Sequence, residues 1–73
     1  MEISQVFGKT IRELRLKAGL TQEQLGLDAD LRRTFVSLLE LGQQQPTLTT
    51  ILKLSAALNL KPSELIKAVE ENI

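Results

Sequence analysis

The sequence predicts an all-α fold, a compact single domain of five helices that spans residues 1–73. Two observations predict this class. Apolar residues recur at intervals of three and four along the chain, which is the periodicity of helices with one buried face. Residues typical of helix starts and ends interrupt this pattern at Thr21, Gly42, Thr47 and Pro62. The expected helices cover approximately residues 4–18, 22–28, 33–41, 48–58 and 62–70.

The first helix, over residues 4–18, has an apolar stripe along one face. The stripe members are spaced by three and four residues and are Ile3, Phe7, Ile11, Leu14 and Ala18. Arg15 lies close to this stripe, so it is either an exposed side chain or one half of a structural ion pair. Gly19 ends the helix because glycine adopts a positive φ without steric strain.

Two short helices follow, and the turn between them is too tight for a flexible loop. Thr21 and Gln24 have the capping-box spacing of a helix start, and the helix over residues 22–28 is expected to bury Leu25. Asp30 occupies the turn, where aspartate tolerates the left-handed conformation better than most residues do.

The next helix, over residues 33–41, is expected to turn Val36 and Leu39 inward and to stop at Gly42. Two helices joined by such a turn form a helix-turn-helix, whose second helix can lie in the major groove of DNA. The pattern therefore indicates a DNA-binding unit.

Arg32 stands at the expected start of that helix and departs from the usual capping pattern. Its side chain has no oxygen to accept the free N–H groups, and a cation is unfavourable at the positive end of a helix dipole. The combination makes sense if Arg32 and Arg33 face phosphates or guanines. The alternative is a solvated pair of cations beside Asp28 or Asp30.

Two further helices complete the chain. Thr47 caps the one over residues 48–58, whose expected inward residues are Leu48, Ile51, Leu52, Ser55 and Leu58. Pro62 suits the first position of the last helix, over residues 62–70. Apolar residues at this end spread over more than one stripe and comprise Leu65, Ile66, Val69 and Ile73.

Composition narrows the possible functions. The chain contains neither Cys nor His, which argues against thiolate or imidazole metal sites and against His-based acid–base chemistry. No nucleophile–base pair or glycine-rich phosphate loop is apparent, so no catalytic residue, metal or cofactor is expected and the protein is not predicted to be an enzyme. The segment MEISQVFGKT lacks the features of a signal peptide, which favours a cytoplasmic protein with no membrane partner.

The formal net charge is zero, which is unusual for a DNA-binding domain. Any positive surface must arise from the distribution of charges over the faces of the molecule. Net neutrality predicts weak non-specific affinity for DNA, because that affinity depends on neutralising phosphates.

The central region resembles a known family. The residues that carry the resemblance are Thr21-Gln22-Glu23-Gln24-Leu25, Arg33-Thr34-Phe35-Val36-Ser37, Glu40, Gly42 and Pro46-Thr47-Leu48. They resemble the helix-turn-helix family of the phage repressors Cro and cI, also called the XRE family. The run Arg33–Ser37 is similar to that of restriction-modification controller proteins. The resemblance implies a lambda-repressor-like fold and a transcriptional regulator that binds double-stranded DNA.

Both chemistry and resemblance select candidate DNA contacts. Arg33 can donate two hydrogen bonds to guanine O6 and N7, and Thr34 or Ser37 can contact a base edge. The resemblance implies base reading by Arg32, Arg33, Thr34, Ser37 and Leu38. Polar residues at the edges of the unit are the expected phosphate contacts, and these are Gln22, Gln43, Gln44, Gln45, Thr47 and Thr49. The alternative for the Gln run is a solvated loop.

The resemblance also implies two structural features. The first is an ion pair between Arg15 and Glu40 that ties the first helix to the third. The second is a two-fold interface formed by the last helix, with Ile66, Val69 and Ile73 as its expected residues. A homodimer would place two recognition helices about 34 Å apart on a near-palindromic operator. Alternatively, these apolar residues simply close the core.

A second class of function remains open from the sequence. Leu38 and Leu41 are apolar on the outer side of the recognition helix, and an exposed Leu pair can belong to a protein-binding face. A protein-interaction module of the same fold, such as an antitoxin or bridging factor, is therefore the alternative to a repressor or autoregulating controller.

Overall fold

The computed structural model describes residues 2–73 and shows five helices among them, as the sequence predicts. Each helix begins and ends within one residue of its expected range. The helices are α1 (Ile3–Lys17), α2 (Gln22–Ala29), α3 (Arg33–Glu40), α4 (Leu48–Ala57) and α5 (Pro62–Glu71).

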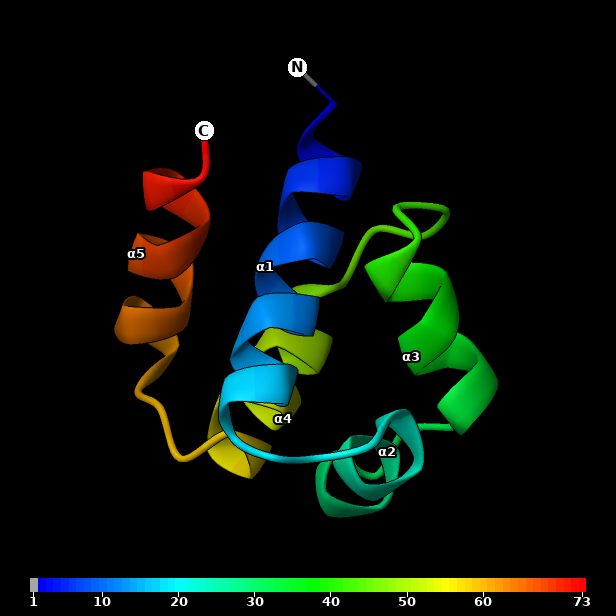
Figure 1. Cartoon of the computed structure of the whole chain (residues 1–73). Coiled ribbons are helices and arrows are strands. Elements are labelled where there is room, and N and C mark those ends of the chain that lie inside the picture. Colours follow the sequence, from blue (N-terminus) through cyan, green and yellow to red (C-terminus); the bar gives the residue numbers. More distant parts are fainter. Residues whose placement is uncertain (1) are drawn as a thin grey trace.

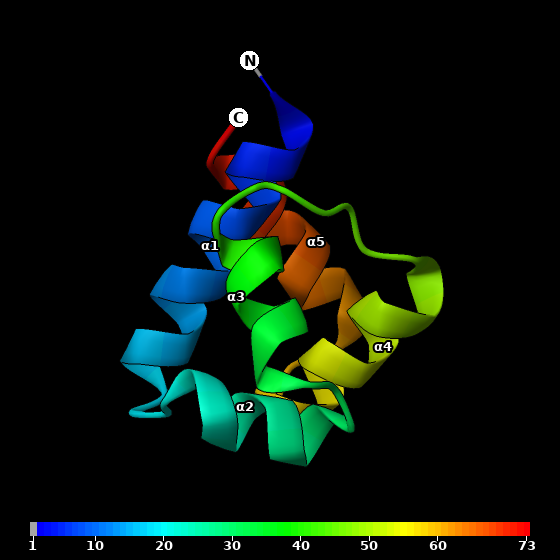
Figure 2. The ribbon, with the colours of Figure 1, turned by 90° about the vertical axis from the view of Figure 1, so that its right-hand side faces the viewer.

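The helices surround one core. α1 runs through the middle of the molecule, with α5 along one side and α3 along the other, while α2 crosses the lower end (Figure 1). Turned by 90°, the molecule shows α3 at its surface, above α2 and beside α4 (Figure 2). Each helix contributes at least one fully buried aliphatic side chain, and these are Ile11, Leu25, Val36, Leu39, Leu54 and Leu65. Burying each contributes about 1.5–3 kcal/mol.

Gly8 allows α1 to approach the end of α3 closely. A Cβ atom at this position would lie 2.7 Å from the backbone oxygen of Glu40 and would also collide with that of Leu39. Only glycine fits there without movement of the backbone. No sequence pattern around Gly8 marks this role, although the residue determines how closely α3 packs against α1.

The buried face of α4 differs in part from the one expected. Ser55 and Leu58 are buried as expected. Leu48 is 73% exposed and Leu52 is 47% exposed, whereas Thr50 and Leu54 are buried in their place. The buried hydroxyls form local hydrogen bonds: Thr50 with the cap residue, and Ser55 Oγ to the Leu52 carbonyl at 2.9 Å. A hydroxyl satisfied in this way can be buried at little cost, so hydrophobic periodicity alone misplaced Leu48, Leu52 and Thr50.

The ends of α1 show the same kind of difference. Ile3 and Ala18 were expected on the inner stripe, but both are exposed, while Ser4 and Thr10 are buried. Thr10 Oγ1 donates to the Val6 carbonyl at 2.8 Å, which satisfies its donor within the helix. In residues 2–73, no helix is long and apolar enough to cross a membrane.

Candidate nucleic-acid interface

The two ends of α2 are fixed by different local features, a side-chain capping box at its start and a left-handed residue in the turn to α3. Thr21 Oγ1 accepts from the Gln24 N–H at 3.0 Å, and the Gln24 side chain accepts from the Thr21 N–H at 2.8 Å, which completes a capping box. Asp30 ends α2 with φ at +56°, and Leu31 N–H donates to the Gly26 carbonyl at 2.8 Å. Asp30 thus serves in the left-handed position where glycine is more usual.

α3, which follows this turn, is an amphipathic helix. Val36 and Leu39 are fully buried, and Phe35 packs partly against the core. The opposite side faces solvent (Figure 2). Of the expected base-reading residues, Arg32, Arg33 and Thr34 are exposed, while Ser37 and Leu38 are partly exposed. The five therefore share the accessible side of α3, with the two cations at its N-terminal tip.

That tip lacks a side-chain cap. Arg32 has extended backbone angles (φ −72°, ψ 144°) and its side chain makes no capping hydrogen bond. The first N–H groups of a helix need acceptors, and the helix dipole favours negative charge there. A phosphate would satisfy both needs and a guanine edge would supply acceptors, whereas Arg32 and Arg33 by themselves satisfy neither need.

An ion pair between Arg15 and Glu40 ties the C-terminal end of α3 to α1. Arg15 Nε donates to Glu40 Oε2 at 2.6 Å and Nη2 donates to Oε1 at 3.0 Å, a two-pronged contact. Arg15 Nη1 also donates to the Leu20 carbonyl at 2.9 Å. The Glu40 side chain is only 4% exposed. Hydrogen bonding to Glu40 raises the pKa of the Arg15 guanidinium, despite its burial. Arg15 therefore links α1, the α1–α2 turn and α3.

Gln22 joins this pair. Its Nε2 donates to Glu40 Oε1 at 3.1 Å, so the residue expected to contact a phosphate is already hydrogen-bonded within the protein. The side chain is partly exposed at the start of α2. The open hollow beside it has a volume of about 610 Å³ and is lined on one side by Arg33. No local sequence pattern indicates the Gln22–Glu40 bond, because the two residues are distant in the sequence.

The other expected phosphate contacts lie at the opposite end of α3. Gln43, Gln44 and Gln45 are exposed in the segment that leads from α3 to α4 (Figure 2). Thr47 Oγ1 accepts from the Thr50 N–H and donates to Thr50 Oγ1, both at 3.1 Å. The Thr47 hydroxyl is thus occupied as the cap of α4, and Thr49 beside it is exposed.

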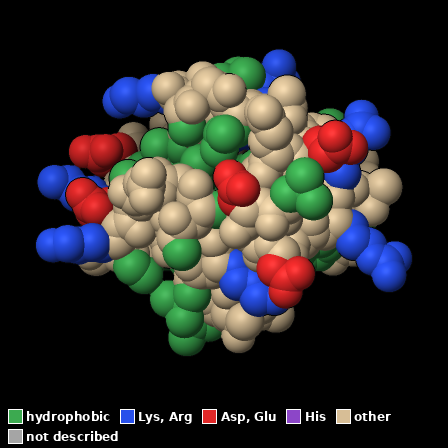
Figure 3. Space-filling model, turned by 90° about the horizontal axis from the view of Figure 1, so that it is seen from below, with side chains coloured by type: hydrophobic (Ala, Val, Ile, Leu, Met, Phe, Trp, Pro, Cys, Tyr) green, Lys and Arg blue, Asp and Glu red, His purple; other side chains and the backbone are tan. Residues whose placement is uncertain are grey.

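The surface is mixed in charge. Seen from below, the molecule shows Lys and Arg side chains around its rim, with Asp and Glu and hydrophobic side chains between them (Figure 3). An ion pair between Lys53 and Asp30, 3.8 Å apart, occupies the end of α2, where the Asp30 side chain is 97% exposed. Side chains of both charge signs are therefore interspersed on this face of the molecule.

Two of the three expected interface residues are exposed, one on α5 and one just beyond its end. Ile66 is 48% exposed and Ile73 is 66% exposed. Val69 is only 8% exposed, so the expectation that it would be free in a monomer is wrong. Val69 lies one turn after Leu65 and packs on the same side of α5 into the core, which removes it from the outer face.

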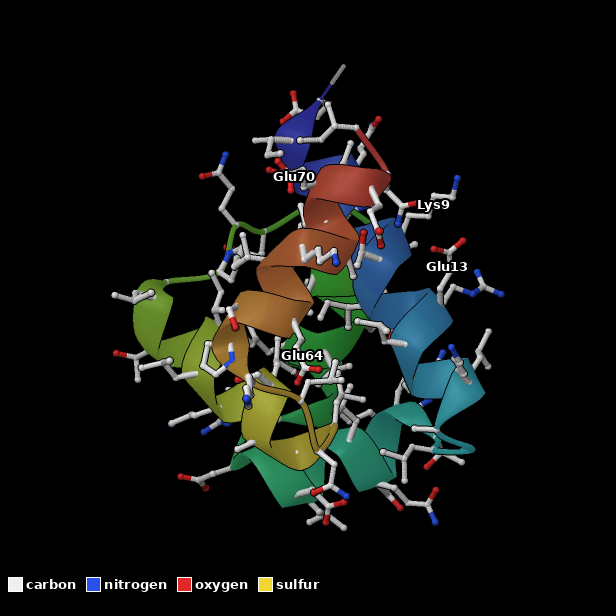
Figure 4. All side chains as sticks on the ribbon, turned by 90° about the vertical axis from the view of Figure 1, so that its left-hand side faces the viewer. Lys9, Glu13, Glu64 and Glu70 are labelled. Carbon is white, nitrogen blue, oxygen red and sulfur yellow. The ribbon has the colours of Figure 1, made fainter. Side chains whose placement is uncertain are left out.

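An apolar groove adjoins this surface. Its volume is about 290 Å³, and its lining includes Ile3, Phe7, Pro46, Ile51, Ile66 and Val69. α5 lies beside α1, with Glu64 and Glu70 on α5 and Lys9 and Glu13 on α1 (Figure 4). Asn72 Nδ2 donates to Thr10 Oγ1 at 2.8 Å and to Glu13 Oε1 at 3.1 Å, which pins the end of α5 to α1.

Comparison with known proteins agrees with this geometry. A family model described as Helix-turn-helix matches residues 11–65, which include α2, the turn and α3. The chain belongs to the helix-turn-helix family.

Its relatives include control proteins. The chain is 38% identical over 65 residues to control protein C.BamHI of Bacillus amyloliquefaciens, covering 88% of this chain and 80% of that protein. It is 36% identical over 66 residues to control protein C.MunI of a Mycoplasma species, covering 89% of each chain. The similarity to controller proteins expected from the sequence is confirmed.

Solved structures show the same fold. The restriction-modification controller protein C.AhdI of Aeromonas hydrophila matches with a TM-score of 0.82 and 44% identity, over 85% of this chain and 94% of that chain. C.Esp1396I, solved as a tetramer in complex with its natural 35 base-pair operator, matches with a TM-score of 0.90. Its identity is 21%, over 99% of this chain and 95% of that chain, so this match bears on the fold.

Proposed function

We propose that this protein is a sequence-specific regulator of transcription that binds double-stranded DNA as a homodimer, with α3 in the major groove. The observation that carries this proposal is the exposed, uncapped tip of α3, where Arg32 and Arg33 stand beside Thr34. The relationship to C.BamHI and C.AhdI supports a controller or repressor role. A regulator of this kind acts in the cytoplasm and needs no cofactor or enzymatic activity.

Base reading is assigned to the accessible side of α3. Arg33 presents a guanidinium that can donate to guanine O6 and N7 together, a contact that contributes about 1–3 kcal/mol of discrimination. Arg32 stands at the same tip, and Thr34 and Ser37 offer hydroxyls to base edges. Leu38 supplies an apolar surface for a thymine methyl group.

Phosphate contacts are assigned to uncharged polar side chains. Gln43, Gln44, Gln45 and Thr49 are exposed beyond the end of α3, and Gln22 lies at the start of α2. Thr47 can contribute only if its bonds with Thr50 rearrange. Because neutral donors release few counterions, DNA affinity should depend less steeply on salt than it does for strongly basic domains.

Self-association is assigned to the exposed apolar residues Ile66 and Ile73. Leaving such residues in water is unfavourable, and a two-fold axis beside α5 would cover both on each copy. Two α3 helices about 34 Å apart would then read a near-palindromic site.

The proposal is tested by selection from a random duplex library, followed by titration of the enriched duplex and a scrambled duplex at several salt concentrations. The upstream region of the gene serves as an additional probe. We expect enrichment of a near-palindromic sequence and preference for it over the scrambled duplex. Equal and weak binding to both would contradict the proposal.

A protein-interaction module of the same fold remains the second candidate, because Leu41 is 62% exposed on the outer end of α3 and net charge is zero. The relationship to control proteins does not favour it. The same titration separates the two, since an interaction module would show no preference between duplexes.

A further inference from the structure

We propose that Glu40 acts in DNA binding as a positioning residue, which holds the Gln22 side-chain amide ready for a phosphate. This inference rests on the proposed function, since it assigns Gln22 to the DNA backbone. It goes further by giving the buried Arg15–Glu40 pair a role in recognition in addition to its role in folding.

The first step is the orientation of the Gln22 amide. Glu40 Oε1 lies 3.1 Å from Gln22 Nε2, and a carboxylate can only accept hydrogen bonds. The amide must therefore present its NH₂ group to Glu40, because its carbonyl oxygen would be repelled. This arrangement also leaves the second N–H of Nε2 free to donate to another acceptor.

The second step is the rigidity of the acceptor. Glu40 is itself held by two bonds from Arg15, at 2.6 and 3.0 Å, and its side chain is 4% exposed. A carboxylate fixed on both oxygens cannot follow a mobile Gln side chain, so Gln22 is fixed by Glu40 and not the reverse. The pairing charge of Arg15 also offsets the repulsion that a lone carboxylate would exert on a nearby phosphate.

The third step is the location. Gln22 is the first residue of α2, where the positive end of the helix dipole favours an anion. Arg33 lines the same open hollow from α3. A phosphate bound by Gln22 would therefore lie beside the residue assigned to base reading, and holding Gln22 would help set the register of α3 in the groove.

A double-mutant cycle on DNA affinity tests the coupling. One arm is Gln22→Met, which removes the amide. The other is the double replacement Arg15→Met with Glu40→Met, since replacing a buried pair by apolar residues of similar size is often neutral for folding. With the selected duplex as probe, each arm should weaken binding roughly three- to tenfold, as expected for one hydrogen bond. Combining them should weaken binding no further than Gln22→Met alone.

A purely structural role for Glu40 gives a different result. The Arg15/Glu40 replacement would then weaken DNA binding by the same factor with or without Gln22, or would leave it unchanged, and either outcome would overturn the inference. If instead the unmodified protein shows no preference for the selected duplex, the proposed function itself fails. The two failures are thus distinguishable.

A second measurement needs no variant. In ¹⁵N-labelled protein without DNA, the Gln22 side-chain amide should be as rigid as the backbone by heteronuclear NOE, whereas that of exposed Gln43 should be mobile. Equal mobility of the two amides would overturn the inference even if the Arg15/Glu40 replacement failed to fold.

Discussion

At the scale of single residues, the arginines of this chain lie in two different environments. Arg15 is enclosed and fully engaged by Glu40 and the Leu20 carbonyl. Arg33 is exposed on α3 and lines the hollow beside the start of α2. Because a guanidinium offers several donors in a fixed plane, the same side chain suits an internal ion pair and a base edge. Loss of the first should affect folding, and loss of the second should affect recognition.

Arg33→Ala should weaken binding to the selected duplex by about 1–3 kcal/mol and relax specificity at one base pair. The measurement is titration against duplexes substituted singly at each position. Arg12→Ala, which removes an exposed guanidinium from α1, is the matched control. If Arg33→Ala weakens binding to all duplexes equally, Arg33 contacts a phosphate and not a base.

Arg15→Ala should lower the free energy of unfolding by about 3–5 kcal/mol, because it leaves a buried carboxylate without its partner. Urea denaturation followed by circular dichroism measures this, and Arg12→Ala should change stability by less than about 0.5 kcal/mol. A loss for Arg15→Ala as small as that of the control would show that Glu40 finds compensation from solvent.

At the scale of elements, close backbone approaches determine how α3 is presented. Gly8 lets α1 meet the end of α3, and Gly26 lets α2 meet the turn, where an added Cβ would lie 2.7 Å from the Leu31 carbonyl oxygen. Helix propensity alone favours alanine over glycine by about 0.5–1 kcal/mol. At these two positions the steric clash of an added Cβ atom opposes the higher helix propensity of alanine, and the cost of the clash should be the larger of the two.

Gly26→Ala should therefore destabilise the protein, by about 1–3 kcal/mol, instead of stabilising it. Gly8→Ala should do the same, since its Cβ would meet backbone atoms and not a flexible side chain. Lys9→Ala on the exposed side of α1 is the control and should be close to neutral. Increased thermal stability of either glycine variant would show that the helices shift apart without strain.

At the scale of the whole molecule, the apolar residues of the C-terminal segment, residues 62–73, divide between folding and the proposed self-association. Leu65 and Val69 close the core, while Ile66 and Ile73 remain exposed. A small domain of zero net charge gains few contacts from one recognition helix, so pairing two copies is the means by which it would reach useful affinity.

Ile66→Glu should convert the dimer to a folded monomer and weaken binding to the two-half-site duplex, because it places a charge in the proposed interface. Sedimentation measures the first effect and titration the second. Lys67→Glu, at the neighbouring exposed position, lowers the net charge by two units where Ile66→Glu lowers it by one, so it is a stringent control for charge. Val69→Glu, in contrast, should unfold the protein. An unchanged dimer with Ile66→Glu would remove α5 from the interface.

The sequence by itself determined the five helices, their limits and the helix-turn-helix. These features depend on local signals, namely periodicity, the Thr21 and Thr47 caps, the left-handed residue Asp30 and the start at Pro62. Such signals act within a few residues of one another, so they can be read without knowledge of the fold.

Only the tertiary structure decided which side chains of each helix are buried and which residues from different helices contact one another. It buried Thr50 and Leu54 in place of Leu48 and Leu52, and it placed Val69 in the core. It also brought Gln22 to the Arg15–Glu40 pair, a contact between residues distant in the sequence. Burial depends on the packing of all five helices together, and a hydroxyl or amide is stable inside only when its partner is in place.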